Sequence, residues 1–130
     1  MSTTVKILRK MSKVFINLSN LHTNKWPEDR LNGAKEIAEG GEIINMAFPI
    51  LGADASKEEV YEKALQTVEK IVEKKPDVVF CQGEFSLCFR IVELLKEANI
   101  KTVTVCNERV IYKEHGREMS GFKFIQFREF

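Results

Sequence analysis

Cysteine and histidine are scarce in this chain. The three cysteines, at positions 81, 88 and 106, are an odd number without any Cys-x-x-Cys spacing, which excludes a disulfide framework and a zinc knuckle. With only two histidines and no paired Cys/His/Asp cluster, we expect no metal site. All three thiols lie among apolar residues, where free cysteine behaves as a small buried hydrophobe, with reactive thiol chemistry as the alternative. We therefore expect a reducing, cytoplasmic location.

Long hydrophobic runs and excess charge are also missing. No stretch approaches the roughly 18 consecutive apolar residues of a membrane span, so we expect no membrane partner. Twenty basic against nineteen acidic residues give a net charge of +1, which argues against a protein that coats duplex nucleic acid. Residues 1–10 lack the apolar core and cleavage site of a signal peptide. We expect residues 1–10 to form an N-terminal extension and 11–130 a single domain.

Glycine-rich phosphate loops are absent as well. None of the seven glycines falls in a G-x-G-x-x-G or G-x-x-x-x-G-K-[ST] motif, which excludes the ordinary dinucleotide-binding and P-loop classes. There is no G-x-S-x-G nucleophile elbow either. A ligand site in this chain must therefore be built from other polar groups, and we expect no cofactor.

Apolar runs that alternate with amphipathic segments are what the sequence does contain. The order strand, helix, strand, helix is typical of a parallel sheet covered on both faces. The helix after residue 56 has a clear start, because Ser56 and Glu59 form a capping box. The predicted strands are 14–18, 42–48, 77–81, 101–106 and the alternating run 122–130. The fold class predicted is α/β: a three-layer Rossmann-like parallel sheet with a C-terminal β-hairpin that turns at His115-Gly116.

Polar residues follow three of the predicted strands, in the segments 19–25, 82–86 and 107–109. In open α/β sheets, ligands bind outside the carboxyl ends of the strands, near the point where the strand order reverses. We therefore predict that the three segments meet and share one ligand, although any strand must leave a sheet through polar residues. The candidate ligand-binding residues are Asn17, Ser19, Asn20, Thr23, Lys25, Gln82, Gly83, Phe85, Ser86, Asn107 and Glu108.

Three residues are candidates for catalysis: Glu84, His22 and Arg109. Arg109 is a bidentate phosphate donor, and Lys25 is the other cation of these loops. Glu84 either accepts hydrogen bonds from an adenine amino group or ribose hydroxyl, or is only a favourable charge at a helix N-terminus. His22 is a general base at neutral pH or a surface histidine without a role. Gly83 lets a backbone approach a ligand or makes a tight turn.

The segments Asn17-Leu18-Ser19-Asn20, Gln82-Gly83-Glu84 and Asn107-Glu108-Arg109, in one small Rossmann-like domain, carry a family resemblance. The chain resembles the small standalone CARF-like (CRISPR-associated Rossmann fold) proteins of type III CRISPR systems, which include ring nucleases. It is also similar to a narrower bacterial family with Asn-His-Pro-Ser after the first strand and Gly-Glu after the third. Here Asn20 is followed by Leu21-His22-Thr23, so the first of those motifs is altered.

The CARF resemblance implies an antiviral homodimer that binds a cyclic oligoadenylate at its two rims. If such a protein also cleaves the ring, the resemblance implies metal-independent transesterification, in which a ribose 2′-OH attacks its own 3′-phosphate. Lys25 or Arg109 would stabilise the charge on the phosphate, and Glu84 or His22 would assist the proton transfer.

Two other classes of function remain open. One is a nucleotide- or nucleoside-processing transferase or hydrolase, with Glu84 as the carboxylate at the sugar. The other is a non-catalytic interaction module, in which the C-terminal strand ending at Phe130 pairs across subunits of a dimer, as exposed alternating strands readily do.

Overall fold

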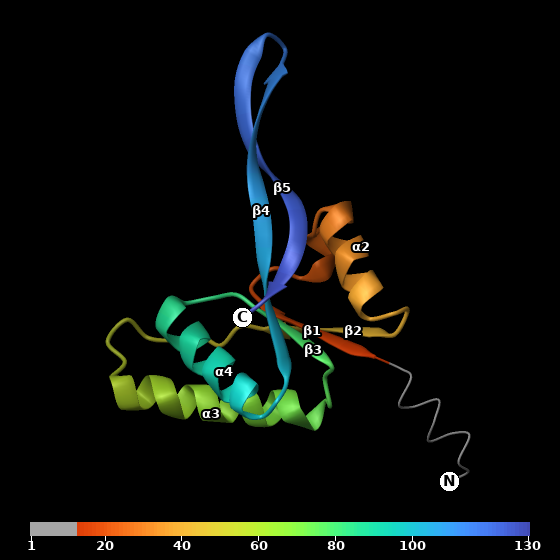
Figure 1. Cartoon of the computed structure of the whole chain (residues 1–130). Coiled ribbons are helices and arrows are strands. Elements are labelled where there is room, and N and C mark those ends of the chain that lie inside the picture. The colour runs from red at the N-terminus through yellow and green to blue at the C-terminus, as the bar shows by residue number, and fades with distance from the viewer. Residues whose placement is uncertain (1–12) are drawn as a thin grey trace, which may run out of the picture.

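The computed structural model describes residues 13–130, so the predicted N-terminal extension 1–10 lies outside the described residues. Within them the chain forms one five-stranded sheet and three α-helices (Figure 1). The elements in chain order are β1 (Val14–Ser19), the 3-10 helix η1 (Thr23–Lys25), α2 (Glu28–Ile37), β2 (Glu42–Ala47), α3 (Lys57–Glu73), β3 (Val78–Cys81), α4 (Phe85–Glu97), β4 (Lys101–Glu114) and β5 (Arg117–Glu129).

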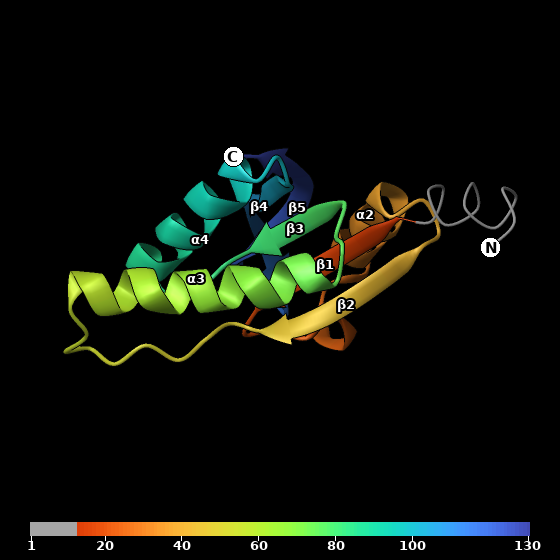
Figure 2. The same cartoon turned by 90° about the horizontal axis from the view of Figure 1, so that it is seen from below.

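The strand order is β2-β1-β3-β4-β5, with the first four strands parallel and β5 antiparallel to β4. Helix α2 lies on one face of the sheet, while α3 and α4 lie on the other (Figure 2). The predicted three-layer α/β fold with a C-terminal hairpin is confirmed. The chain moves outward from β1 to β2 and then returns past β1 to β3, so the order reverses between β1 and β3. This is the position at which open α/β sheets bind ligands.

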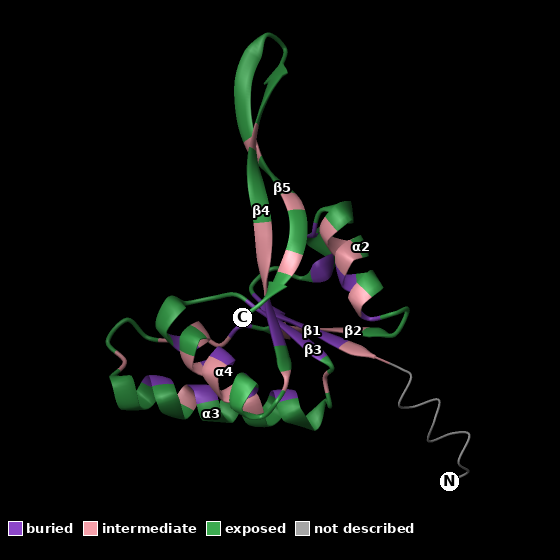
Figure 3. Cartoon of the chain, in the orientation of Figure 1, coloured by how far each residue is buried: buried purple, intermediate pink, exposed green. Residues whose placement is uncertain are grey.

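Two hydrophobic cores, one on each face, hold the layers together (Figure 3). Successive strand residues point to opposite faces, so Phe15 packs toward α2 and Ile16 toward α3 and α4. All four residues of β3 are buried, as expected of a central parallel strand. Burial of each large side chain such as Phe15 or Phe80 stabilises the fold by roughly 1.5–3 kcal/mol.

The local signals for the helices operate as the sequence predicts. Ser56 accepts a hydrogen bond from the Glu59 backbone N–H, and the Glu59 side chain accepts one from the Ser56 backbone N–H, which completes the capping box of α3. Pro27 stands at the N-cap of α2, where its missing N–H costs no helical hydrogen bond.

Strand β4 is longer than the sequence predicts. The segment 107–109 was expected to be a loop, but it lies inside β4 and pairs with residues 122–124 of β5. The ribbon is irregular only at a β-bulge, where Ile125 has no partner between those of Cys106 and Asn107. The outer half of β4 packs against no core, so polar residues can continue the strand as long as its backbone pairs with β5. It closes in a two-residue turn at His115 (φ 51°) and Gly116 (φ 75°), the positive-φ pair of a type I′ hairpin.

The hairpin projects beyond the carboxyl edge of the sheet (Figure 1). The pairing of β3 with β4 ends at Phe80 and Val103, so residues 105–114 run past the end of β3. At about 3.3 Å per residue, ten residues span roughly 30 Å. Only the base of the ribbon is supported by the body, where Phe124 and Phe127 pack with ring centroids 5.0 Å apart and Phe124 lies against Gly33 of α2.

Candidate functional site

Two of the three predicted loops meet at the switch point between β1 and β3. The backbone N–H of Gln82 donates to the carbonyl of Leu18 over 3.0 Å, which joins the loop after β3 to the end of β1. The crevice between them is occupied, however, by the ring of Phe48. The backbone N–H of Phe48 donates to the carbonyl of Ser19. A Cβ on Gly83 would overlap that ring, so Phe48 accounts for the glycine without a ligand. Phe48 is 4% exposed and closes the centre of the predicted site.

Three of the predicted ligand contacts belong instead to a buried polar network. Asn17 donates through Nδ2 to the Leu21 carbonyl and to Asn45 Oδ1, both over 2.8 Å, and its Oδ1 accepts from the Ser19 hydroxyl. Asn45 Oδ1 also accepts from the backbone N–H of Thr23, and its Nδ2 donates to the Thr23 hydroxyl. Asn17, Ser19 and Thr23 are buried and Asn45 is half-buried, and each buried polar group needs such a partner. The network holds the loop after β1 against the sheet.

Asn45 was missed in the sequence analysis, although one signal for it exists. It is a polar residue in the middle of the apolar strand β2, and its register partner on β1 is Asn17. A depression of about 250 Å³ lies over this pair. It is lined by Asn17, Ser19, Asn20, His22, Asn45, Met46 and Ala47.

Three of the predicted contacts in the first loop are exposed: Asn20, His22 and Lys25. His22 is the N-cap of η1, and its Nδ1 accepts a hydrogen bond of 3.1 Å from the backbone N–H of Asn24. That atom is therefore occupied, while Asn20 and Lys25 face solvent and remain candidate contacts for a ligand.

Glu84 caps the N-terminus of α4, and Ser86 in the first turn of the helix donates to it. The Glu84 carboxylate accepts from the backbone N–H groups of Leu87 and Ser86 and from the Ser86 hydroxyl, over 2.8–3.1 Å. The bond from Leu87, followed by those from Ser86, lowers the pKa of Glu84 below its ordinary value. A carboxylate held ionised in this way is a poor proton carrier at neutral pH. It also occupies the helix terminus at which a phosphate would bind.

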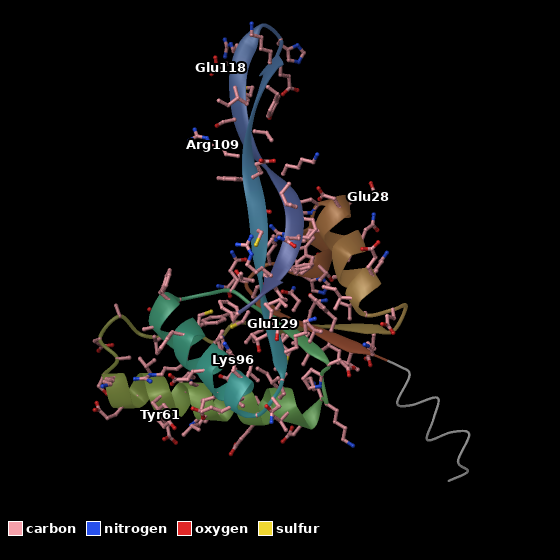
Figure 4. All side chains as sticks on the ribbon, in the orientation of Figure 1. Glu28, Tyr61, Lys96, Arg109, Glu118 and Glu129 are labelled. Carbon is pink, nitrogen blue, oxygen red and sulfur yellow. The ribbon has the colours of Figure 1, made fainter. Side chains whose placement is uncertain are left out.

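The third predicted loop does not reach this site. Asn107, Glu108 and Arg109 are residues of the projecting hairpin, opposite Phe124, Lys123 and Phe122. Arg109 lies five residues beyond Thr104, which at about 3.3 Å per residue is roughly 17 Å past the end of β3. Figure 4 shows its side chain out on the projecting hairpin. The expectation that all three segments share one ligand is therefore wrong within a single copy. Arg109 is separated from Glu84 and His22, which remain in the loops at the base.

A second, mostly apolar cavity of about 380 Å³ opens beside the end of β3. Three phenylalanine rings at it are left to solvent: Phe85 is 91% exposed, Phe89 59% and Phe130 43%. The sequence analysis named Gln82, Gly83 and Phe85 here but missed Phe89 and Phe130, although Phe85 and Phe89 are four residues apart on one helix. The lining residues are Cys81, Gln82, Gly83, Phe85, Cys88, Phe89, Val92, Thr104 and Phe130.

Two further properties concern residues 13–130 only. In this part of the chain no three His, Cys, Asp or Glu side chains gather in a way that could hold a metal ion. No helix of the same residues is long and apolar enough to cross a bilayer.

These features define a class: a doubly wound α/β domain with its switch point sealed by Phe48, and a long β-ribbon on its carboxyl edge. Comparison with protein families matches residues 13–128 to the family described as "Uncharacterized protein MJ1673 family". The chain belongs to that family. No curated protein and no solved structure gives a significant match.

Proposed function

We propose that this chain is a homodimeric nucleotide-binding module that accepts a base in the apolar cavity beside β3. The cyclic oligoadenylate implied by the CARF resemblance is the ligand class to test first. One observation carries the proposal: at the carboxyl end of a central parallel strand, three exposed phenylalanine rings surround a cavity that also holds a free amide, that of Gln82.

The chemistry of this cavity suits a purine better than a phosphate. Stacking of a base on an aromatic side chain contributes about 1–3 kcal/mol, and the rings of Phe85, Phe89 and Phe130 offer such surfaces. An amide like that of Gln82 pairs with the N6 and N7 edge of adenine. The volume of about 380 Å³ lies within the range of small-molecule sites. Since the Glu84 carboxylate repels phosphate from the adjacent helix terminus, the phosphates of a bound ring would face outward.

Binding without cleavage is the form of the function that the geometry favours. Glu84 is engaged as a helix cap, and Arg109 is out on the hairpin of the same copy. A metal-independent ring nuclease needs groups that align the 2′-OH and stabilise the phosphate together. In the described residues these candidates do not converge, so cleavage is an outcome of the test and not part of the proposal.

The hairpin supports the homodimeric part of the proposal. A two-stranded ribbon alone in water is marginally stable, and this one carries large apolar side chains on both faces. Ile111 and Phe122 share one face and are 66% and 76% exposed, while Tyr112 and Met119 share the other. Such surface is normally covered by a partner.

The charge pattern of the hairpin favours a second copy of this chain as that partner. Residues 107–123 carry four basic and three acidic side chains, interleaved along both strands. A two-fold interface brings one surface against itself, so it must be self-complementary in charge. A nucleic-acid arm would instead need a strong basic excess.

Thermal-shift measurements against cyclic tri-, tetra- and hexa-adenylate, linear oligoadenylates, AMP and adenosine test the proposal. A cyclic ligand present at a hundred times its Kd should stabilise the fold by about 2.7 kcal/mol. The Phe85→Ala/Phe89→Ala variant should lose the shift, while Tyr61→Ala, an exposed aromatic residue on α3, should keep it.

Each other outcome has a meaning. A shift with AMP or adenosine alone, or chemical turnover of either, supports the nucleotide-processing class and overturns the cyclic ligand. Linear products from the ring overturn binding without cleavage. No shift with any of these ligands, in a protein that is still dimeric, leaves the interaction module as the function.

A further inference from the structure

Cys81 and Cys88 form a pair of thiols in direct contact. Cys81 is the last residue of β3 and Cys88 lies in the first turns of α4, and their Sγ atoms are 3.4 Å apart. Both thiols are free, as is Cys106 on β4. The pairing depends on the tight β3–α4 connection, which returns the helix over the end of the strand.

The two thiols have different environments. Cys81 is 2% exposed in the core, whereas Cys88 is half-buried and both line the 380 Å³ cavity beside β3. The hydrogen bond with Cys88 and burial raise the pKa of Cys81. The pKa of Cys88 is lowered, first by the hydrogen bond from Cys81 and then by the Gly83 backbone, while burial and the Glu84 carboxylate oppose this shift.

The Sγ of Cys88 is therefore both the more accessible and the more reactive of the two sulfurs. The thiolate is the form that attacks a disulfide, and the group that most readily becomes one is Cys88. The cavity gives a small disulfide a path to its Sγ. Cys81 lies immediately behind it, with its Sγ 3.4 Å from that of Cys88.

We propose that Cys81 and Cys88 are a redox-active dithiol that exchanges with low-molecular-weight disulfides such as glutathione disulfide. The Cys88 thiolate attacks one sulfur of the glutathione disulfide, forms a mixed disulfide and releases one glutathione thiolate. Cys81 then loses its proton and attacks Cys88 Sγ, which forms the Cys81–Cys88 disulfide and releases the second glutathione. The pair gives up two electrons, and one glutathione disulfide is reduced to two thiols.

The final bond requires only a small movement. A disulfide has an S–S length of about 2.05 Å, so the two sulfurs must approach each other by roughly 1.3 Å. The inference does not depend on the proposed nucleotide function, because it rests on the thiol pair and the opening alone.

The test is a titration of the full reduced chain with glutathione disulfide, followed by denaturation, alkylation and mass spectrometry. In the wild-type protein we expect the number of alkylated cysteines to fall from three to one. The remaining label should be on Cys106, and the mass before alkylation should fall by two hydrogens. Peptide mapping should recover a Cys81–Cys88 cross-link.

Single variants separate the two steps. Cys81→Ala should stop at one glutathione adduct on Cys88. Cys88→Ala should keep both remaining thiols alkylatable, while Cys106→Ala should lose both. Thermal unfolding of each variant shows whether it is folded. If a variant is not folded, the wild-type titration alone tests the proposed dithiol. Three labelled cysteines at every ratio of disulfide to thiol, or a cross-link through Cys106, would overturn the inference.

Discussion

The ring of Phe48 lies directly over the Cα of Gly83, so the segment after β2 and the turn after β3 fill the same crevice from two sides. This contact closes the point at which an open α/β sheet usually accepts its ligand. The cavity beside α4 and the hairpin remain open to solvent at this edge of the sheet.

Gly83→Ala should destabilise the protein, because the added methyl group overlaps a buried ring. We expect a loss of about 2 kcal/mol in the free energy of unfolding, the typical cost of overpacking a core, measured by urea denaturation. Gly121→Ala is the matched control, since its Cβ would meet Tyr112 at an ordinary 3.6 Å. Trimming the ring with Phe48→Leu should recover part of the loss in the double variant. Equal stability of Gly83→Ala and the wild type would contradict this packing.

The acid stability of the protein should depend in part on Glu84. The pKa of Glu84 is lower in the folded state than in the unfolded state, where it is near 4.5. The stability that ionised Glu84 contributes is therefore fully present above the unfolded-state pKa and is lost as the pH falls through the folded-state pKa. Glu84→Gln should therefore lower the thermal midpoint at pH 7. The difference from the wild type should shrink below about pH 4.5. A difference that stays constant from pH 7 to pH 3 would show that ionised Glu84 is not the cap.

The network around Asn17 should be structural. Asn17→Ala removes two donated hydrogen bonds and leaves the Ser19 hydroxyl without one acceptor, so we expect a loss of about 2 kcal/mol in unfolding free energy. The backbone amide of Thr23 should also exchange its hydrogen faster, because the loop after β1 loosens. Asn20→Ala, at an exposed asparagine of the same loop, should leave both quantities unchanged. Unaltered Thr23 exchange in Asn17→Ala would show that the loop is held by other contacts.

The hairpin should determine the oligomeric state. Removing residues 121–130 is a poor test, because it deletes Phe127 from the core. A shorter hairpin that joins Glu108 to Lys123 through Asn-Gly keeps their register and the whole body. We expect this variant, and Ile111→Glu/Phe122→Glu, to be monomeric in sedimentation experiments at concentrations where the wild type is dimeric. A wild-type monomer, or dimeric variants, would eliminate the hairpin as the interface.

Local signals made most of the fold predictable. Apolar runs marked the four parallel strands, and Ser56 and Glu59 marked the start of α3. The turn at His115-Gly116 also forms as predicted. The length of β4 was not predictable in this way, because the run of Asn107, Glu108 and Arg109 has the composition of a loop. It became a strand only by pairing with β5, a contact distant in sequence.

The candidate site was less predictable for the same reason. Polar residues after β1 and β3 were correctly placed at one edge of the sheet. The sequence does not say whether such residues face a ligand or one another, and Asn17, Ser19 and Thr23 face one another through Asn45. Phe48 could not be anticipated at Gly83, since the two are far apart along the chain.

The sequence by itself determined the layers of this protein, because hydrophobic periodicity and helix caps act over a few residues and need no partner element. Only the tertiary structure decided what the carboxyl edge presents. Strand order brought Phe48 over Gly83. Pairing with β5 carried Arg109 away from the other candidates. These are contacts between segments that the chain separates, and they are made only when the sheet assembles.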